Sequence, residues 1–303
     1  MAGRIAVIGS NMVDLVTYVT RMPERGETVE APSFEMGHGG KGANQAVAAA
    51  KLGADVLMVT KVGDDMFGDG TIANLRRFGI DTRHVEKVAG RSSGVAPIMV
   101  EPSGENALLI VKGANADLSP ADVERAGEDL RRCDLILLQL EVPVETVYSA
   151  LDFGRRHGIA TLLNPAPALP TLDVARIGSA TFLVPNESEL CILSGRPVDS
   201  MEEVEAAARR LMARGIGTIV VTLGSRGALL AEASGSTLIP PHPVTPVDTT
   251  GAGDAFIGSF ARYYLAERDT VAALRRAVRY AADSITRRGT QKAYATEAEF
   301  TPG

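Results

Sequence analysis

The chain has 303 residues, 45% of them hydrophobic and 22% charged, with 31 glycines and 16 prolines. This composition is typical of a folded globular protein and excludes disordered, collagen-like and fibrous chains. The formal net charge is −6 and no run of Lys or Arg exceeds two residues, which disfavours a nucleic-acid partner and favours a small-molecule one.

Continuous apolar runs alternate with helical patterns along the chain. The runs predict buried strands at residues 4–8, 56–60, 135–140, 159–163, 181–184 and 218–222. Glycines at 53, 79, 158 and 215 stand where the intervening helices should end in a left-handed residue. Repeated strand–helix units predict an α/β fold with a mostly parallel central sheet and helices on both faces.

Two stretches interrupt this alternation. Residues 15–36 lack a helical pattern and contain turn sequences, and residues 91–112 contain apolar runs at 95–100 and 107–111 around Glu-Pro-Ser-Gly at 101–104. The second stretch predicts a β-hairpin. We expect both stretches to form a small second sheet inserted into one domain that covers residues 1–303. That sheet is either a lid over a site or an immobile extension of the sheet edge.

Cysteines, histidines and hydropathy point to a cytoplasmic protein. Cys133 and Cys191 have neither CxxC spacing nor nearby histidines, which predicts reduced thiols. The four histidines are scattered, so a histidine-built metal site is not expected. The apolar run near the first residue is too short for a signal peptide, and no run reaches the roughly 18 residues that span a bilayer. We therefore expect no membrane partner.

Residues 37–42 (Gly-His-Gly-Gly-Lys-Gly) match the pattern GxGxxG, and Asp64 lies 22 residues after Gly42. A dinucleotide-binding fingerprint needs a buried strand leading into the glycines, and residues 30–36 form a poor one. A Walker A loop is excluded because Gly42, not Ser or Thr, follows Lys41. What remains is a tight turn opening a helix over 43–52. It is either structural, or it offers backbone amides, with Lys41 and Asn44, to a hydroxylated ligand.

Residues 248–256 (Asp-Thr-Thr-Gly-Ala-Gly-Asp-Ala-Phe) form the sharper motif. Gly251, Ala252 and Gly253 would leave amides free at the start of an apolar helix reaching about residue 266, which favours anion binding. Asp254 lies in the first turn, and a carboxyl with an ordinary pKa of about 3.9 is ionised at neutral pH. It could accept a proton from an attacking hydroxyl while the amides stabilise a transferring phosphoryl group. The plainer alternative is a helix cap.

Together the motifs resemble the ribokinase-type (PfkB) carbohydrate kinases over the whole chain. Residues 39–45 (Gly-Gly-Lys-Gly-Ala-Asn-Gln) are similar to the sugar-binding signature of that family, and residues 248–254 to its C-terminal signature. Four further segments occur in the family's order, at 139–141, 164–168, 185–187 and 222–227. The likeness is strongest to ribokinases and bacterial deoxyribokinases, and residues 9–14 (Gly-Ser-Asn-Met-Val-Asp) are particularly like the latter. The resemblance implies a three-layer ribokinase-like fold with a β-sheet lid.

The resemblance implies ATP-dependent phosphorylation of the 5-hydroxyl of a free pentose, D-ribose or 2-deoxy-D-ribose. Asp254 would be the catalytic base, and Gly251, Ala252 and Gly253 the anion hole. The implied sugar-binding residues are Met12, Asp14, Gly40, Lys41, Gly42, Ala43, Asn44, Glu141 and Asp254. The implied ATP-binding residues are Asn186, Thr222, Gly224, Ser225, Gly227, Gly253 and Val278. Asp14, in the loop after the first strand, and Glu141 would lie at the carboxyl edge of the sheet.

The resemblance also implies two cations and a partner chain. Asn186 and Glu189 match an NxxE element that organises Mg²⁺ and its waters around the phosphates. The implied K⁺ site consists of Asp248, Thr250, Ser284, Arg287, Gly289 and Ala293. Ala293 stands where relatives commonly have serine, so one side-chain oxygen is missing. Paired lids in this family commonly build a homodimer, which we expect here.

Met12 is the informative departure in the implied sugar site, because many ribokinases have asparagine there. A thioether cannot replace that hydrogen bond well, and burying a hydroxyl without a partner costs about 1–3 kcal/mol. We therefore expect 2-deoxyribose to be a good substrate, unless Asn11 compensates. The alternatives are a kinase of a nucleoside such as adenosine or of a hexose such as fructose, a non-catalytic sugar sensor on the same fold, and a nicotinamide oxidoreductase.

Overall fold

Nine strands form one large sheet in the part of the chain that the computed structural model describes, residues 3–103 and 105–300. Their order is β13-β12-β11-β10-β9-β8-β1-β4-β5. The strands from β11 to β5 run parallel, whereas β12 pairs antiparallel with both β11 and β13, so the predicted mostly parallel sheet is confirmed. The strands are β1 (Arg4–Ile8), β4 (Asp55–Gly63), β5 (Asp81–Val88), β8 (Leu135–Leu138), β9 (Ala160–Leu163), β10 (Phe182–Leu183), β11 (Ile219–Thr222), β12 (Ala228–Glu232) and β13 (Gly235–Ile239).

All six predicted strands are present, and β1 matches its predicted range at both ends. The sequence pattern does not predict β5 and β13, which lie at the two edges of the sheet, or β12, which lies between β13 and β11. An edge strand is covered incompletely, and the residues of β5 are all half-buried or exposed. Those of β13 are exposed except Ile239. Such strands need no continuous apolar run, which is the signal that reveals the inner strands.

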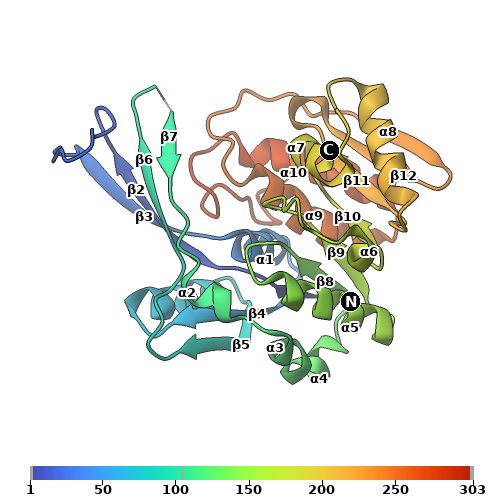
Figure 1. Ribbon diagram of the computed structural model, residues 1–303, viewed down its shortest axis with the longest axis horizontal. Helices are drawn as coiled ribbons and strands as arrows, with labels where there is room; N and C mark the ends of the chain where they lie inside the picture. The colour runs from blue at the N-terminus through green and yellow to red at the C-terminus, as the bar shows by residue number, and fades with distance from the viewer. Residues whose placement is uncertain (1–2, 104, 301–303) are drawn as a thin grey trace.

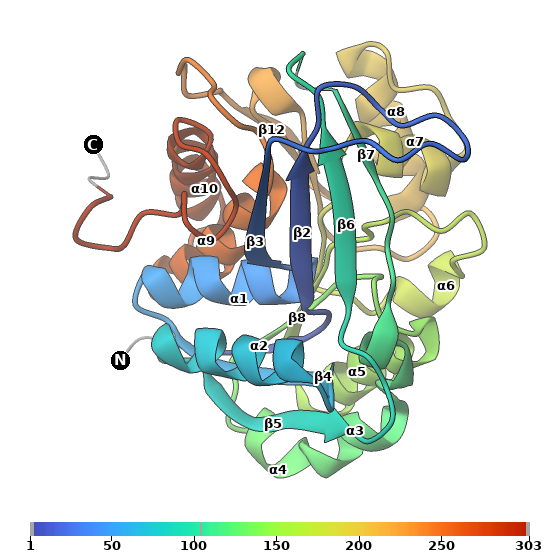
Figure 2. The ribbon, with the colours of Figure 1, turned by 90° about the vertical axis from the view of Figure 1, so that its left-hand side faces the viewer.

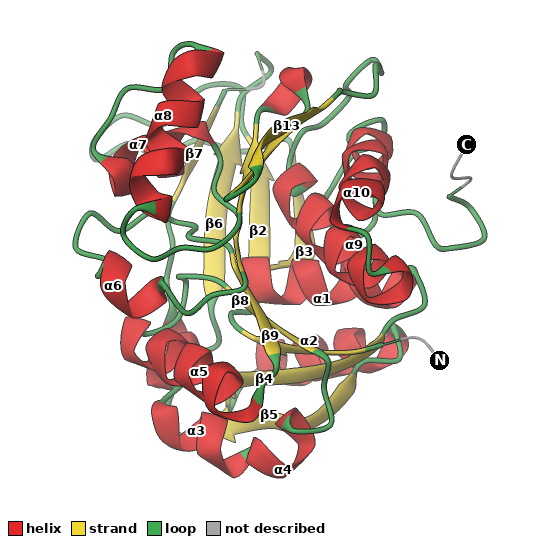
Figure 3. Ribbon diagram, turned by 90° about the vertical axis from the view of Figure 1, so that its right-hand side faces the viewer, coloured by secondary structure: helices red, strands yellow, loops and turns green. Residues whose placement is uncertain are grey.

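Helices cover both faces of the large sheet (Figure 1), and Figure 3 shows α5 to α8 to the left of the sheet and α9 and α10 to its right. Alternation along each strand separates the two cores. In β1, Ile5 and Val7 pack into one apolar cluster, while Ala6 and Ile8 pack into the other. The first cluster includes residues of α1 (Lys41–Lys51), α2 (Met66–Arg77), α9 (Ala252–Glu267) and α10 (Thr270–Ser284). The second includes residues of α3 (Pro120–Arg125), α4 (Gly127–Leu130), α5 (Val144–His157), α6 (Val174–Ile177), α7 (Glu187–Ser194) and α8 (Met201–Met212).

The helix boundaries agree closely with the sequence punctuation. Glycines 53, 79, 158 and 215 all have positive φ, as predicted. The helix α1 begins at Lys41, two residues before the predicted start at 43, because Gly40 takes the N-cap position with φ 86°. Among the described residues, we find no helix with both the length and the apolar character needed to cross a membrane.

A second sheet of four strands has the order β3-β2-β6-β7, and we call it the small sheet. It consists of β2 (Met12–Tyr18), β3 (Ser33–Gly39), β6 (Val95–Val100) and β7 (Asn106–Leu108). The predicted hairpin is confirmed by the antiparallel pair β6–β7, although Gly104 of its turn lies outside the described residues. In Figure 1 the small sheet stands at the upper left, and in Figure 2 β2, β3 and β6 rise beside α1.

One expectation about this region is wrong. Asp14 lies on β2 and not in a loop, because pairing with β3 and β6 begins at Met12 and Val13. The residues ahead of the glycines do form a strand, β3, but it is an edge strand paired antiparallel with β2. A strand covered mainly on one face needs few apolar residues, so its sequence reads as a poor buried strand. The parallel strand of a dinucleotide-binding unit is therefore absent at this described segment.

Parallel strands end at a common edge of the large sheet, which gathers the motifs. Gly9 and Ser10 follow β1, while Gln139 and Glu141 follow β8. Asn164 follows β9, and the segments 185–189 and 222–227 follow or end β10 and β11. Residues remote in sequence therefore meet at one edge.

Candidate active site

Asp254 is the centre of the site. It lies in the first turn of α9 and its side chain is 7% exposed. Its Oδ2 accepts a hydrogen bond from Asn44 Nδ2 at 3.0 Å, and its Oδ1 accepts one from Gln45 Nε2 at 3.0 Å. The helices α1 and α9 approach closely because residue 258 is glycine; a Cβ there would lie 2.5 Å from the Gln45 carbonyl oxygen. The two glycine-rich motifs therefore meet at one carboxylate.

The charge of Asp254 is set by opposing effects. Burial raises the pKa of Asp254 above its ordinary value, and Glu141 adds to the rise. The Lys41 ammonium and the amides of Asn44 and Gln45 act in the opposite direction and favour the carboxylate. Sequence alone suggested an ordinary carboxyl, whereas the buried position makes this group a stronger proton acceptor. A raised pKa is what a general base working near neutral pH requires.

The turn before α9 combines a tight conformation with open space. Gly251 is the N-cap residue with φ 77°, and a Cβ there would lie 2.3 Å from Thr290 Cγ2. Tyr294 Oη donates a hydrogen bond to the Gly251 carbonyl at 3.0 Å. A Cβ on Gly253, by contrast, would meet no atom of the described residues within 4 Å. The backbone around Gly253 can therefore be approached by a ligand, and the first-turn amides of a helix attract anions.

Lys41 and Glu141 lie together at the start of α1. Glu141 Oε2 accepts hydrogen bonds from Lys41 N at 2.9 Å and from Ser10 Oγ. Burial would lower the pKa of Lys41, but Asp254, Glu141 and Glu189 outweigh it and raise the pKa above the ordinary value. Residue 42 must be glycine, because a Cβ would lie 2.6 Å from Ser10 N. The glycine turn is thus partly structural, and it also brings a charged amine to the carboxylates.

Asp14 reaches the same cluster from the small sheet. Its two carboxyl oxygens would lie 2.4 and 2.5 Å from a Cβ on Gly39, so glycine at 39 leaves space for this side chain. Burial, followed by Glu141 and Asp254, raises the pKa of Asp14 to about 6. The structure therefore brings Asp14, Glu141 and Asp254 together, as the resemblance implied.

Met12 and Asn11 lie at the start of β2. Met12 is buried, with 2% of its surface exposed. The Asn11 amide Nδ2 donates to Thr60 Oγ1 and to the Lys61 carbonyl, each at 2.8 Å. Both hydrogens of that amide are therefore used inside the protein. Asn11 is not free to donate the hydrogen bond that asparagine at position 12 would supply.

Five of the residues expected to bind ATP, Asn186, Thr222, Gly224, Ser225 and Gly227, lie along the ends of β10 and β11. Asn186 forms a bridge with Thr222 and is the N-cap of α7, where it makes a capping box with Glu189. Gly224 and Ser225 lie in the short 3₁₀ helix η2 (Gly224–Arg226), and Gly227 follows with φ 91°. Val278 lies on α10 in the apolar core and is 8% exposed. Burial is the main cause that raises the pKa of Glu189.

The six positions expected to hold K⁺ come from two segments that lie side by side. Asp248 Oδ2 accepts from Gly289 N at 2.9 Å, and its Oδ1 accepts from Thr250 N at 2.9 Å. The Arg287 Nε donates to the Ala293 carbonyl at 2.9 Å. Ser284 lies at the end of α10 and donates to the Ala281 carbonyl.

The sequence patterns indicate no role for several polar residues around Asp254. These are Ser10, Gln45, Gln139, Asn164 and Gln291, all buried. Gln45 lies in the 39–45 motif, and Gln139 and Asn164 lie in two of the quoted segments. Their motifs were therefore a signal, but their hydrogen-bond partners come from distant parts of the chain.

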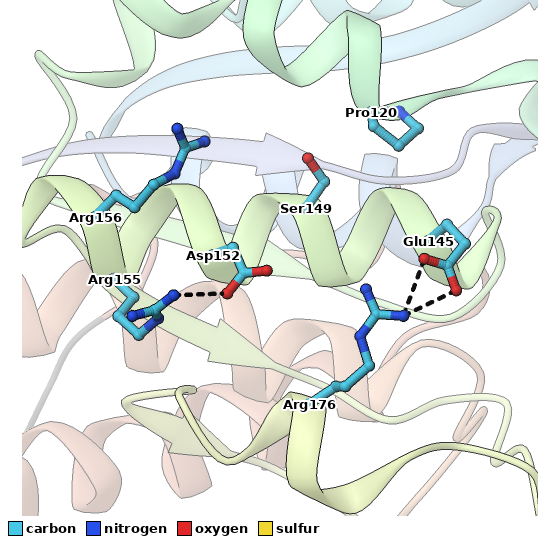
Figure 4. Close-up of a pocket in the computed structure, with 7 residues that line it drawn as sticks. All are labelled: Pro120, Glu145, Ser149, Asp152, Arg155, Arg156 and Arg176. Carbon is cyan, nitrogen blue, oxygen red and sulfur yellow. Dashed lines mark hydrogen bonds and ion pairs between the residues drawn. The ribbon is translucent and has the colours of Figure 1, made fainter.

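A separate depression of about 420 Å³ lies over α5 and shares no residue with this cluster (Figure 4). Its arginines are paired: Arg176 Nη1 lies 3.0 Å from Glu145, and Arg155 Nη2 lies 3.3 Å from Asp152 Oδ1. Arg156 Nη2 lies 2.6 Å from Glu124 Oε1. With its charges neutralised in pairs, this surface is not a candidate for the active site.

Comparison with known proteins identifies the class. The family model described as pfkB family carbohydrate kinase matches residues 2–297. The deoxyribokinase of Salmonella typhimurium is 57% identical over 296 residues, which cover 98% of this chain and 97% of that protein. The ribokinase of Bacillus subtilis is 42% identical over 295 residues, covering 97% of each. The chain therefore belongs to the pfkB family of carbohydrate kinases, and the expected family is confirmed.

Solved structures of ribokinases have the same fold as this chain. The ribokinase of Arabidopsis thaliana, in complex with ribose and ATP, matches with a TM-score of 0.93 and 29% identity. The match covers 99% of this chain and 97% of that chain. The ribokinase of Thermotoga maritima has a TM-score of 0.89 and 33% identity, with 98% of this chain and 97% of that chain covered. The expected ribokinase-like fold is confirmed.

The raised pKa of Asp14 predicts a pH-dependent effect on stability. The folded protein binds this proton more tightly than the unfolded chain, so the free energy of unfolding falls as the pH rises from about 4 to about 6. Replacing the Asp14 carboxyl with an amide abolishes this fall in the free energy of unfolding. We expect Asp14→Asn to raise the free energy of unfolding at pH 7.5 by about 1–3 kcal/mol, with the gain vanishing towards pH 4.

Urea unfolding of both proteins across this pH range measures the effect. Asp199→Asn, at an exposed position, is the matched control and should change little at any pH. A gain for Asp14→Asn that does not vary with pH would contradict the explanation.

Proposed function

We propose that the protein is an ATP-dependent kinase that phosphorylates the 5-hydroxyl of a free pentose. The observation that carries this proposal is the buried Asp254 carboxylate at the start of α9, held by Asn44 and Gln45 beside Lys41. The Salmonella deoxyribokinase and Bacillus ribokinase, similar over almost the whole chain, support a pentose. The Arabidopsis ribokinase complex with ribose and ATP supports both substrates.

In this mechanism the 5-oxygen of the sugar attacks the γ-phosphorus of ATP, and the bond to the ADP oxygen breaks. The hydroxyl proton passes to Asp254, whose pKa burial raises. The backbone at 251–253 stabilises the negative charge of the transferring phosphoryl group. Asp14 and Glu141 accept hydrogen bonds from other sugar hydroxyls, and Lys41, Asn44 and the backbone of Gly40, Gly42 and Ala43 complete the sugar site.

ATP would lie along the ends of β10 and β11, against Asn186, Thr222, Gly224, Ser225 and Gly227. Val278 would contact the adenine from α10. Among the described residues there is no group of three or more His, Cys, Asp or Glu side chains suited to a metal. Mg²⁺ binds largely through phosphate oxygens and water, so a sparse protein contribution from Asn186 and Glu189 fits it. The ion would neutralise phosphate charge.

We also propose a monovalent cation beside the anion hole, at the loops joined by Asp248 and Gly289. The available donors are chiefly oxygens, which suit K⁺, but Ala293 supplies only a backbone carbonyl that already accepts from Arg287. We expect K⁺ activation to be correspondingly weaker than in a relative with serine there.

We propose that residues 1–303 form one domain whose small sheet serves as a lid, limiting hydrolysis of ATP by water. We propose a cytoplasmic location, supported by the two free cysteines of the described chain. The preference between pentoses should favour 2-deoxyribose, since Met12 is buried and Asn11 is already hydrogen-bonded elsewhere.

The proposed base is tested by Asp254→Asn. We expect kcat to fall by roughly 10²–10⁴, because general base catalysis is lost, while the Kd for the sugar changes little. A coupled assay of ADP release and calorimetric titration of the sugar measure the two quantities. The matched control is Asp269→Asn, an exposed residue at the start of α10 whose carboxylate accepts from Ala272 N. Full turnover by Asp254→Asn would place the base elsewhere.

The role of Met12 is tested by comparing ribose and 2-deoxyribose. We expect Met12→Asn to raise the kcat/KM ratio of ribose to 2-deoxyribose by about 5- to 100-fold, because the amide supplies a partner for the extra hydroxyl. Met12→Leu, similar in volume but without a donor, should leave that ratio near the wild-type value. A wild-type preference for ribose of at least about a hundredfold would end the deoxyribose hypothesis.

We propose that the small sheet also mediates a homodimer. It and the segment after it carry the exposed apolar side chains Phe34, Met36, Leu108, Leu109, Ile110 and Val111. Such a patch is typical of a protein interface. Sedimentation should give a dimer for the wild type and a monomer for Leu109→Glu. Leu238→Glu, at an exposed site on β13, should remain dimeric. A monomeric wild type at micromolar concentration would refute the dimer.

A further inference from the structure

A chain of side-chain amides joins the surface of α2 to Asp254. Arg77 Nη2 donates to Asn74 Oδ1 at 3.2 Å, and Asn74 Nδ2 donates to Gln291 Oε1 at 2.8 Å. Gln291 Nε2 then donates to Asn44 Oδ1 at 2.9 Å, and Asn44 Nδ2 donates to Asp254 Oδ2 at 3.0 Å. Every link donates in the same direction, towards the carboxylate. We call these four donors the amide chain.

A shorter chain reaches the other carboxylate oxygen. Gln139 Nε2 donates to Gln45 Oε1 at 2.6 Å, and Gln45 Nε2 donates to Asp254 Oδ1 at 3.0 Å. The Asn164 Oδ1 lies 3.3 Å from the same Gln45 nitrogen, and its Nδ2 donates to the Val184 carbonyl. Both oxygens of Asp254 therefore receive N–H donors whose orientation is fixed by a second residue.

The direction of the longer chain is set at its outer end. An amide can present either its N–H or its oxygen to a neighbour, but a guanidinium can only donate. The guanidinium of Arg77 therefore fixes the orientation of the Asn74 amide. That amide fixes the orientation of the Gln291 amide, which in turn fixes that of Asn44. The exposed fractions of Asn74, Gln291 and Asn44 are 8%, 5% and 6%, so water competes little with the bonds among these three residues, whereas Arg77 at the outer end is exposed.

We propose that Asn74 and Gln291 are positioning residues that keep the N–H group of Asn44 directed at Asp254 and thereby set the proton affinity of the catalytic base. Neither residue contacts Asp254. The proposal rests on the proposed function, in which Asp254 takes the proton of the sugar hydroxyl. It gives α2 a part in the chemistry, and it adds a second role to the loop after α10, which also carries three of the positions proposed to hold K⁺.

Other charged groups also act on Asp254 and must stay constant in a test. Lys41 favours the carboxylate, whereas Glu141 disfavours it, and burial raises the pKa overall. Electrostatic interactions with Asp254 also raise the pKa values of Asp14, Glu189 and Tyr294. A substitution within the amide chain leaves all these groups in place.

Asn74→Asp should reverse the direction of the hydrogen bonds in the amide chain, although residue 74 does not contact Asp254. A carboxylate only accepts, so Gln291 would turn its Nε2 towards the new acid and its Oε1 towards Asn44. Asn44 would then donate to Gln291 and present Oδ1 to Asp254. Two facing oxygens repel unless Asp254 is protonated, so its pKa would rise.

The measurement is the pH dependence of the single-turnover phosphoryl-transfer rate at saturating sugar and ATP. We expect Asn74→Asp to move the acid limb upward by about one pH unit or more, which reflects the lost charge-assisted hydrogen bond. Above the shifted limb the rate should recover to within about threefold of the wild type. Ala73→Asp adds the same charge at an exposed neighbouring position and should leave the limb in place.

Two results would overturn the proposal. A rate lowered equally at every pH would mean that Asn74 is merely structural, and equal shifts in Asn74→Asp and Ala73→Asp would mean that added charge alone acts. If Asn74→Asp does not fold, Gln291→Met replaces it; this variant removes the donor to Asn44 without adding charge and should shift the limb in the same direction. An unmoved limb there would refute the proposal.

The parallel experiment on Asp254→Asn separates the two hypotheses. If that variant keeps full turnover, the proposed base is wrong and the chain has no catalytic group to position. If it loses turnover while the acid limb of the chain variants does not move, the proposed function stands and only the role of Asn74 and Gln291 fails.

Discussion

The close contact between α1 and α9 is the constraint on which the site depends. Gly258 lets the two helices approach until the side chains of Asn44 and Gln45 reach Asp254. A carboxylate that is almost fully buried needs such donors, since its lone pairs would otherwise face apolar surroundings. The same contact unites motifs about 200 residues apart in the sequence. The packing of these two helices therefore also places the buried carboxylate that we propose as the catalytic base.

The glycines that mark the two motifs serve different physical purposes. At Gly42 and Gly251 a Cβ would collide with the protein itself, against Ser10 and Thr290. At Gly253 a Cβ would meet open space, so that position is left bare for an incoming group. A sequence pattern of glycines does not distinguish these two cases, yet only the open space at Gly253 leaves the backbone accessible to a ligand. Gly39 is a third case, because its missing Cβ makes space for the carboxyl of Asp14.

Much of the architecture could be predicted from local sequence, because the inner strands are apolar throughout and their helices carry clear end signals. The edge strands β5 and β13 cannot be predicted in this way, because a partly buried strand needs no continuous apolar run. Motifs located the site residues, but local pattern could not reveal which amide faces which carboxylate. Asn44 accepts from Gln291, which accepts from Asn74, and these three residues come from different parts of the chain. Likewise, the raised pKa of Asp14 comes from burial and from neighbours brought close only by folding.

The strand β2 connects the candidate site to the small sheet. It carries Met12 and Asp14, pairs with both β3 and β6, and so sits inside the small sheet. Its partner β3 runs through Gly39 straight into Gly40 and the first turn of α1. A substitution at residue 12 or 14 therefore also acts on the pairing of the small sheet with its neighbours. Substitutions at these two positions should therefore be accompanied by compensating changes along β3 and β6.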